Sequence, residues 1–210
     1  GPFFLVQRAM RHMRPAGGKI VLTSTASARH GGGVTSLAYG VAKAGVEKIR
    51  QYLSANPPLT LHHRAMIFWA SQYIDGLMSK EDRKAVVDEL LVLQREDGGW
   101  GLATLGNWKR SDGTDQDTKS SDGYGTGFVI CMARLGGVPA ADPRIGRGIA
   151  WLKTHQRESG RWFTRSLNKD SRHLITNAGS AFAVMALHAC GETATAQTAA
   201  GASASSGGSQ

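Results

Sequence analysis

Tyr39 and Lys43 are two residues whose types and spacing could support proton transfer. They are four positions apart in a segment expected to open a helix, so both side chains would lie on one helix face. An ammonium group beside a phenol lowers the phenol's pKa, because it favours the charged form of the phenol. This pair therefore indicates acid–base chemistry, provided that the surrounding segments can position a substrate beside it.

Carboxylates and histidines supply the other candidates. Asp122 precedes an apolar segment, where it could be a lone acid facing a cavity, although a helix N-cap is the favoured interpretation. Residues 112–117 crowd carboxylates but lack the closing Glu and the oxygen spacing of a calcium loop, which favours a solvated loop. His62 and His63 open another apolar segment, where packing at the helix end is favoured over a site at a cavity mouth. No metal site is predicted.

A short buried strand should precede the helix of Tyr39. Residues 19–23 are apolar and β-branched, which is typical of a parallel strand covered on both faces. The strand, the hydroxyl-rich turn after it and the Tyr-x-x-x-Lys spacing together resemble the short-chain dehydrogenase/reductase family. The resemblance implies that Tyr39 is the proton donor, Lys43 its partner, and Thr25 or Ser24 the accompanying hydroxyl, with NAD(P) as cofactor.

That family's Gly-rich phosphate turn is absent from the sequence, and so are the strands that should follow Lys43. Residues 1–43 are therefore expected to be an inert α/β (Rossmann-type) remnant. NAD(P)-dependent reduction by this segment is kept as the alternative function.

Two later turns share one pattern. Gln156, Gly160 and Trp162 follow an amphipathic segment, and Gln94, Gly98 and Trp100 repeat them upstream. Internal repetition at a fixed period indicates stacked structural units. In each unit the glycine permits a sharp exit from the helix, and the tryptophan supplies a large ring to bury.

These turns resemble the QW repeat of the squalene–hopene cyclase and oxidosqualene cyclase family. The second copy, which starts at Arg147-Gly148, matches the repeat throughout, whereas the first has Ala85 and Val86 in place of the leading basic-Gly pair. In that family the Gln side chain bonds the end of an adjoining outer helix. The resemblance implies a structural role for the six residues and an α/α toroid of helical hairpins.

Helical periodicity leads to the same architecture. Residues 65–77, 127–135 and 178–189 are apolar almost all round, which predicts buried inner helices, while residues 79–94 and 142–156 are amphipathic, which predicts outer helices. These helices supply only part of a ring, so a missing toroid half or a partner subunit should cover the exposed flank. Any cavity should be lined by apolar inner-helix residues, namely Phe68, Trp69, Phe128, Phe182 and Met185.

Composition limits the possible partners. The net charge of +9 is spread along the chain without a dense basic cluster, which argues against specific nucleic-acid binding. No apolar run is long enough to span a membrane, and Cys131 and Cys190 are predicted to be free thiols. We expect three parts: residues 1–43, a cyclase-like repeat domain at 44–191, and a disordered low-complexity tail at 192–210.

The acid cluster Asp-x-Asp-Asp, with which squalene–hopene cyclases protonate an alkene, is absent from the sequence. The leading prediction is therefore a non-catalytic repeat domain that binds an apolar, isoprenoid-like ligand or a partner through its inner helices, without a cofactor. A third hypothesis is that the two parts were joined artificially.

Overall fold

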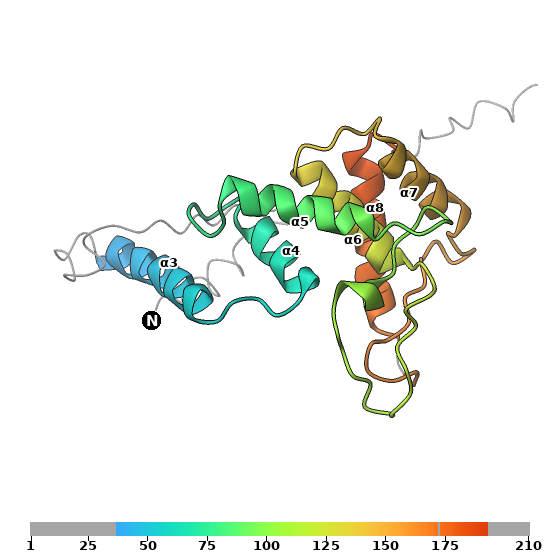
Figure 1. Ribbon diagram of the computed structural model, residues 1–210, viewed down its shortest axis with the longest axis horizontal. Helices are drawn as coiled ribbons and strands as arrows, with labels where there is room; N and C mark the ends of the chain where they lie inside the picture. The colour runs from blue at the N-terminus through green and yellow to red at the C-terminus, as the bar shows by residue number, and fades with distance from the viewer. Residues whose placement is uncertain (1–36, 172, 193–210) are drawn as a thin grey trace, which may run out of the picture.

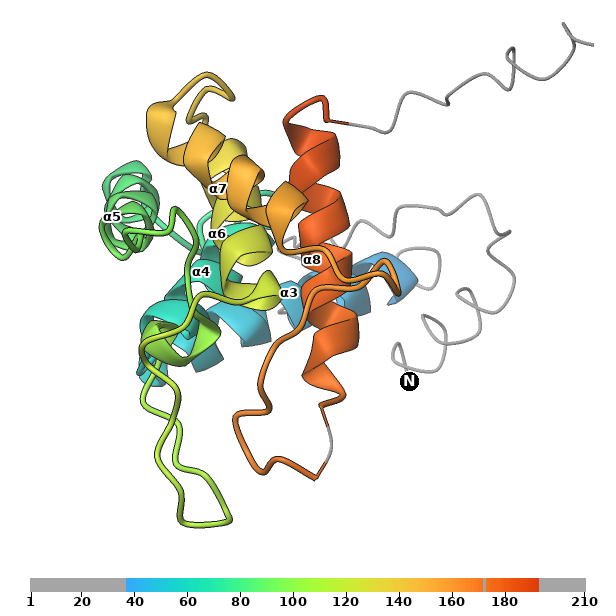
Figure 2. The same ribbon diagram turned by 90° about the vertical axis from the view of Figure 1, so that its right-hand side faces the viewer.

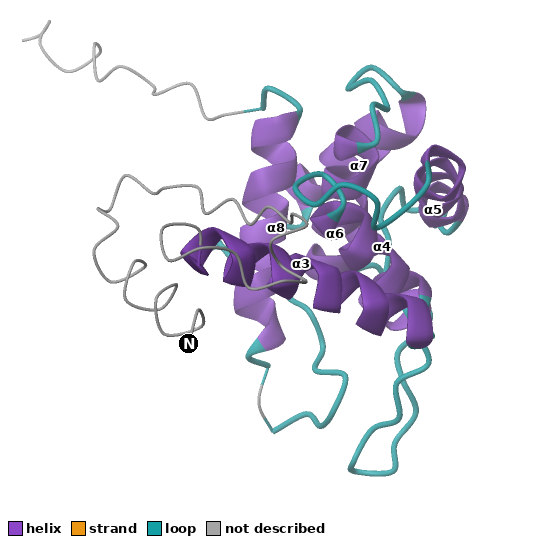
Figure 3. Cartoon of the chain, turned by 90° about the vertical axis from the view of Figure 1, so that its left-hand side faces the viewer, coloured by secondary structure: helices purple, strands orange, loops and turns teal. Residues whose placement is uncertain are grey.

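The computed structural model describes residues 37–171 and 173–192, and over these residues the chain is helical. This described part contains six α-helices, a short 3-10 helix and no strand (Figure 3). The prediction of a mainly α chain is thus confirmed there. The predicted strand at residues 19–23 and the tail after residue 192 lie outside the described residues, and closure into a toroid stays a prediction.

The helices follow one another in two kinds. In chain order they are α3 (Leu37–Ala55), α4 (Leu61–Ala70), α5 (Lys80–Val92), η2 (Leu102–Leu105), α6 (Gly123–Leu135), α7 (Pro143–Thr154) and α8 (Ile175–Ala189). Figure 1 shows α3 at one end of the long axis and α6, α7 and α8 together toward the other. The predicted boundary between residues 43 and 44 falls inside α3, which runs through it without a break.

Three helices begin at caps that the sequence predicts. The Ser79 hydroxyl accepts a hydrogen bond from the Asp82 amide at 2.9 Å at the start of α5. Asp122 accepts from the Gly125 amide at 2.8 Å and so caps α6, as expected. At the start of α7, Asp142 accepts from the Arg144 amide at 2.8 Å. Each cap satisfies a backbone donor that the first helical turn leaves unpaired.

The first inner helix is displaced from its predicted position. Residues 65–77 were expected to be helical, but α4 covers Leu61–Ala70. Thr60 moves the start because its hydroxyl accepts from the His63 amide at 3.2 Å and caps the helix there. Beyond Ala70 the chain turns, and Gly76 adopts a φ of 76°, a left-handed conformation that glycine permits.

Helices α6 and α8 pack backbone to backbone at the centre of the molecule (Figures 1 and 2). A Cβ atom on Gly127 of α6 would lie 2.5 Å from the Ala183 amide nitrogen of α8. A Cβ atom on Gly179 of α8 would lie 2.9 Å from the Tyr124 nitrogen of α6. Since neither glycine has a side chain, the helices approach more closely than ordinary side chains allow.

The two cysteines are unpaired, as predicted. Cys131 is buried in α6, and Cys190, the residue that ends α8, is partly buried. Burial raises the pKa of the Cys131 thiol to about 12, so this thiol stays protonated near neutral pH.

Candidate functional site

The turn after α5 joins two successive repeats. The Gln94 amide nitrogen donates to the Gly98 carbonyl within the turn at 2.9 Å and to the Arg144 carbonyl of α7 at 2.7 Å. The Arg147 guanidinium of α7 donates to the Gln94 carbonyl oxygen. A single side chain therefore contacts its own turn and the next outer helix, where it bonds at two points.

Trp100 fills the space behind this turn. Its side chain is fully buried, and its indole nitrogen donates to the Leu90 carbonyl at 2.9 Å. A Cβ atom on Gly148 of α7 would lie 2.7 Å from the indole ring, so only glycine fits at that point of α7. The ring thereby fixes how closely α7 approaches α5 and α6.

The turn after α7 repeats this geometry. The Gln156 amide nitrogen donates to the Gly160 carbonyl at 3.0 Å, and the Trp162 indole nitrogen donates to the Leu152 carbonyl at 2.6 Å. Gly98 and Gly160 have φ angles of 88° and 75°. The two turns therefore have the same local structure.

The five residues predicted to line an apolar pocket divide into two groups. Phe68 and Phe128 are buried in the core, with 1% and 0% of their surfaces exposed. Trp69 of α4 and Phe182 of α8 are partly exposed and meet edge to face, with ring centroids 5.9 Å apart. Met185 is 44% exposed, one helical turn beyond Phe182. The pocket itself stays a prediction.

A histidine and a tyrosine pair inside the same aromatic cluster. The His62 Nε2 and Tyr124 hydroxyl atoms are 3.0 Å apart, and the His62 ring stacks on Phe128 at a centroid distance of 5.0 Å. Burial, followed by the neighbouring His63, lowers the pKa of His62, so the neutral imidazole is favoured. Sequence analysis weighed His62 only as a helix-end residue, because its tyrosine partner lies 62 positions further along the chain.

Asp122 serves as a junction between three segments. Besides capping α6, its carboxylate accepts from the Leu102 amide of η2 at 2.7 Å and from the Thr164 hydroxyl at 3.2 Å. Burial of the carboxylate raises its pKa, and the hydrogen bonds that it accepts oppose this effect. Because both oxygens already accept hydrogen bonds, the geometry favours a structural role for Asp122 over proton donation to a ligand.

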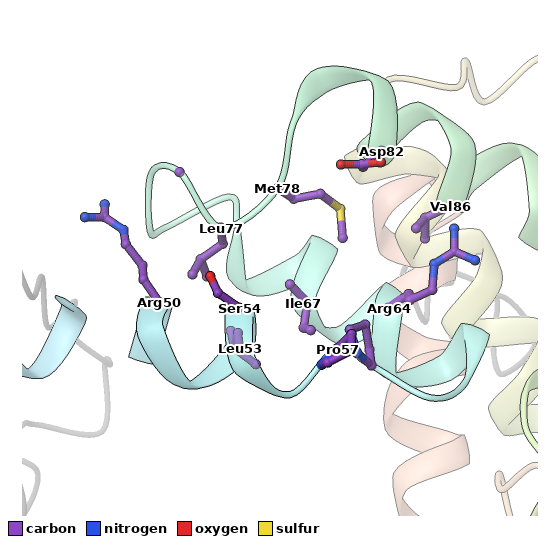
Figure 4. A pocket seen from close by; sticks show the side chains of 12 residues that line it. Arg50, Leu53, Ser54, Pro57, Arg64, Ile67, Leu77, Met78, Asp82 and Val86 are labelled. Carbon is purple, nitrogen blue, oxygen red and sulfur yellow. The ribbon is translucent and has the colours of Figure 1, made fainter. Parts of the chain in front are cut away.

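A cavity of about 400 Å³ opens between α3, α4 and α5 (Figure 4). Its apolar lining includes Leu53, Pro57, Ile67, Leu77, Met78 and Val86. The charged groups at its edge already have partners: Arg64 forms a bidentate pair with Glu89 at 2.7 and 2.8 Å, and Arg50 bonds the Asp75 carbonyl. The cavity is therefore suited to a small uncharged molecule. Its lining was not foreseen, because α3 and α5 carry most of it.

Two long loops project from one side of the molecule and are tied together (Figures 1 and 2). The Arg110 guanidinium has no exposed surface and bonds Asp112 at 2.7 Å and Asp170 of the other loop at 3.0 Å. Arg165 forms a second ion pair with Asp170 at 2.6 Å. This loop brace, formed by Arg110, Asp112, Arg165 and Asp170, holds the segments that precede α6 and α8.

The loop brace predicts an acid-sensitive contribution to stability. The ion pairs with Arg165 and Arg110 lower the pKa of Asp170 from 3.8 to about 2. Because the folded-state pKa lies below the unfolded one, the contribution is present above pH 3.8 and is lost as the pH falls through about 2. We expect Asp170→Asn to lower the melting temperature at pH 6 but to have no effect at the acid end of this window. Thermal unfolding across pH measures it, with Asp115→Asn as the control.

The residues of the reductase hypothesis are described only in part. Tyr39 and Lys43 lie in the first turns of α3, where the backbone alone is described, and Thr25 lies outside the described residues. Acid–base chemistry by this pair therefore stays a prediction.

Other kinds of site were sought over the same residues. Among residues 37–171 and 173–192, no group of three or more His, Cys, Asp or Glu side chains is placed to hold a metal ion. No helix within the part of the chain that the structure describes is both long and apolar enough to cross a membrane.

Comparison with known proteins indicates one relationship. A squalene–hopene cyclase is similar to this chain. That protein, from Zymomonas mobilis, is 34% identical over 118 residues, which cover 52% of this chain and 15% of the cyclase. The matched region thus spans a small part of the relative's length. No family model and no solved structure matches the chain.

Proposed function

We propose that residues 44–191 form a cyclase-like helical repeat domain that binds an apolar, isoprenoid-like ligand on its inner helices. The similarity to a squalene–hopene cyclase and the two equivalent glutamine turns support the cyclase-like part of this proposal. Cyclisation is not part of it, because the sequence lacks the Asp-x-Asp-Asp acids and the carboxylate of Asp122 is engaged in capping α6.

An exposed apolar surface carries the ligand proposal. Trp69 and Phe182 meet at its centre, and each is followed or preceded by a methionine at helical spacing: Met66 on α4 and Met185 on α8, which are 39% and 44% exposed. Methionine side chains are flexible and polarisable, and they adapt to apolar ligands of irregular shape. We call these four residues the inner surface.

Displacement of a fluorescent probe tests this function. The uncharged dye Nile red would be bound to the purified chain and titrated with farnesol and with squalene. We expect both to displace it, and Met185→Lys to weaken displacement about tenfold, because it places an ammonium group against the ligand. The matched control is Val92→Lys, at an 80% exposed position on the outer helix α5. Equal effects of the two substitutions, or no displacement at all, would contradict the proposal.

A further inference from the structure

The two glutamine turns differ in what lies beyond them. Gln94 is partly buried and Gly98 is buried, because α7 covers both. A Cβ atom on Gly98 would lie 2.9 Å from the Arg147 carbonyl oxygen of α7. Gln156 and Gly160 are exposed, and the nearest atom to a Cβ on Gly160 would be the side chain of Gln156 itself, at 4.0 Å.

The second turn therefore has bonding capacity that the first turn uses. Within residues 37–171 and 173–192, Gln156 bonds its own turn and no other helix. The position that α7 occupies beside Gln94 is, beside Gln156, uncovered by any described helix. Because the turns share one geometry, the contacts of Gln94 specify what would fit beside Gln156.

The first turn selects a basic residue followed by glycine. Arg147 donates to the Gln94 carbonyl oxygen, and Gly148 allows the helix to approach the Trp100 ring. A larger residue at Gly148 would collide with that ring and with Ile130, whose side chain would be 2.9 Å from a Cβ atom. A helix that docks at Gln156 should therefore carry an Arg-Gly or Lys-Gly pair in its second turn.

This chain has no spare pair of that kind. Arg147-Gly148 is the single Arg-Gly or Lys-Gly pair in the sequence, and Gln94 already binds it. The corresponding residues of α5 are Ala85 and Val86, and residues 192–210 contain neither Lys nor Arg. Neither the tail nor a second copy of the chain thus supplies the required helix.

We propose that the exposed turn at Gln156 and Gly160 docks the outer helix of a helical repeat in another polypeptide, through an Arg-Gly or Lys-Gly pair on that helix. The surface continues the interface that α7 forms with the turn at Gln94. The proposal concerns a different face from the inner surface and does not depend on ligand binding.

The chain offers a way to attach a test helix in the required geometry. Gly137 follows α6 and Gly191 follows α8, with φ angles of 86° and 78°. The next amide in each case donates back into the helix: Val138 to Ala133 at 3.0 Å, and Glu192 to Leu187 at 2.8 Å. A second copy of residues 138–191 inserted after Gly191 would therefore leave α8 as α7 leaves α6, and would bring a fresh Arg-Gly pair.

The test compares Gln156→Ala in the original and the extended chain by thermal unfolding. In the original chain we expect almost no change in melting temperature, because Gln156 is exposed. In the extended chain we expect a drop of about 4 °C, since two intermolecular-type hydrogen bonds are lost. An extended chain whose added glycine is replaced by valine is the control, and there the drop should disappear.

Three results would overturn the proposal. Gln156→Ala might lower the melting temperature equally in both chains, or the added repeat might melt separately from the rest. Sedimentation of the original chain supplies the third: a concentration-dependent dimer that Gln156→Ala abolishes would make a second copy the partner. A chain that stays monomeric supports docking of another polypeptide.

Discussion

Gly127→Ala is expected to destabilise the chain by about 3 kcal/mol, although alanine favours a helix more than glycine does. The added methyl group would lie 2.5 Å from the Ala183 nitrogen and from the Phe182 carbonyl carbon. Both atoms belong to the backbone of α8, so no rotation of a side chain can relieve the collision. The two helices must separate, and the separation would loosen the packing along α6.

The same substitution elsewhere provides the control. Gly146 lies in α7 with no atom within 4 Å of a Cβ position, so Gly146→Ala should raise stability by about 0.5 to 1 kcal/mol. Urea unfolding followed by circular dichroism measures both variants. Equal stabilities would show that α6 and α8 are not in backbone contact in solution.

Trp100→Ala is the second large effect, with an expected loss of about 4 kcal/mol. The indole ring is fully buried between α5, α6 and α7, and its removal leaves a cavity that rigid helices cannot close. The bond from its nitrogen to the Leu90 carbonyl is lost as well.

Two further variants separate these contributions. Trp100→Phe keeps most of the ring but not the donor, and should cost about 1 to 2 kcal/mol. Tyr73→Ala removes an aromatic ring that is 71% exposed, and should change stability by less than about 0.5 kcal/mol. If Trp100→Ala proved as mild as Tyr73→Ala, the junction between the repeats would not depend on this ring.

Local signals in the sequence predict the helix starts well. Ser79, Asp122 and Asp142 are caps that a reader can identify because the capping residue and the helix are adjacent. The same approach misplaced the first inner helix, since Thr60 lies before two histidines and its capping role was overlooked. The helical nature of the chain therefore follows from sequence, whereas individual ends depend on weaker caps.

Contacts between distant residues could not be predicted in this way. The pairing of His62 with Tyr124 and that of Arg110 with Asp170 each join segments about 60 positions apart, and no periodic pattern marks them. Glycine at position 127 gives no sign of its neighbour until α8 is placed against it. The repeated Gln, Gly and Trp residues are the exception, because their recurrence links two parts of the sequence directly.

The central position of α6 also affects how the chain can fold during its synthesis. Eleven consecutive residues, from Gly123 to Ala133, are buried, and α8 supplies much of their cover. Helix α8 ends at Ala189, so α6 remains uncovered on that side until that residue has left the ribosome. A nascent chain that stops short of α8 should therefore expose an apolar helix, bind chaperones and be degraded readily.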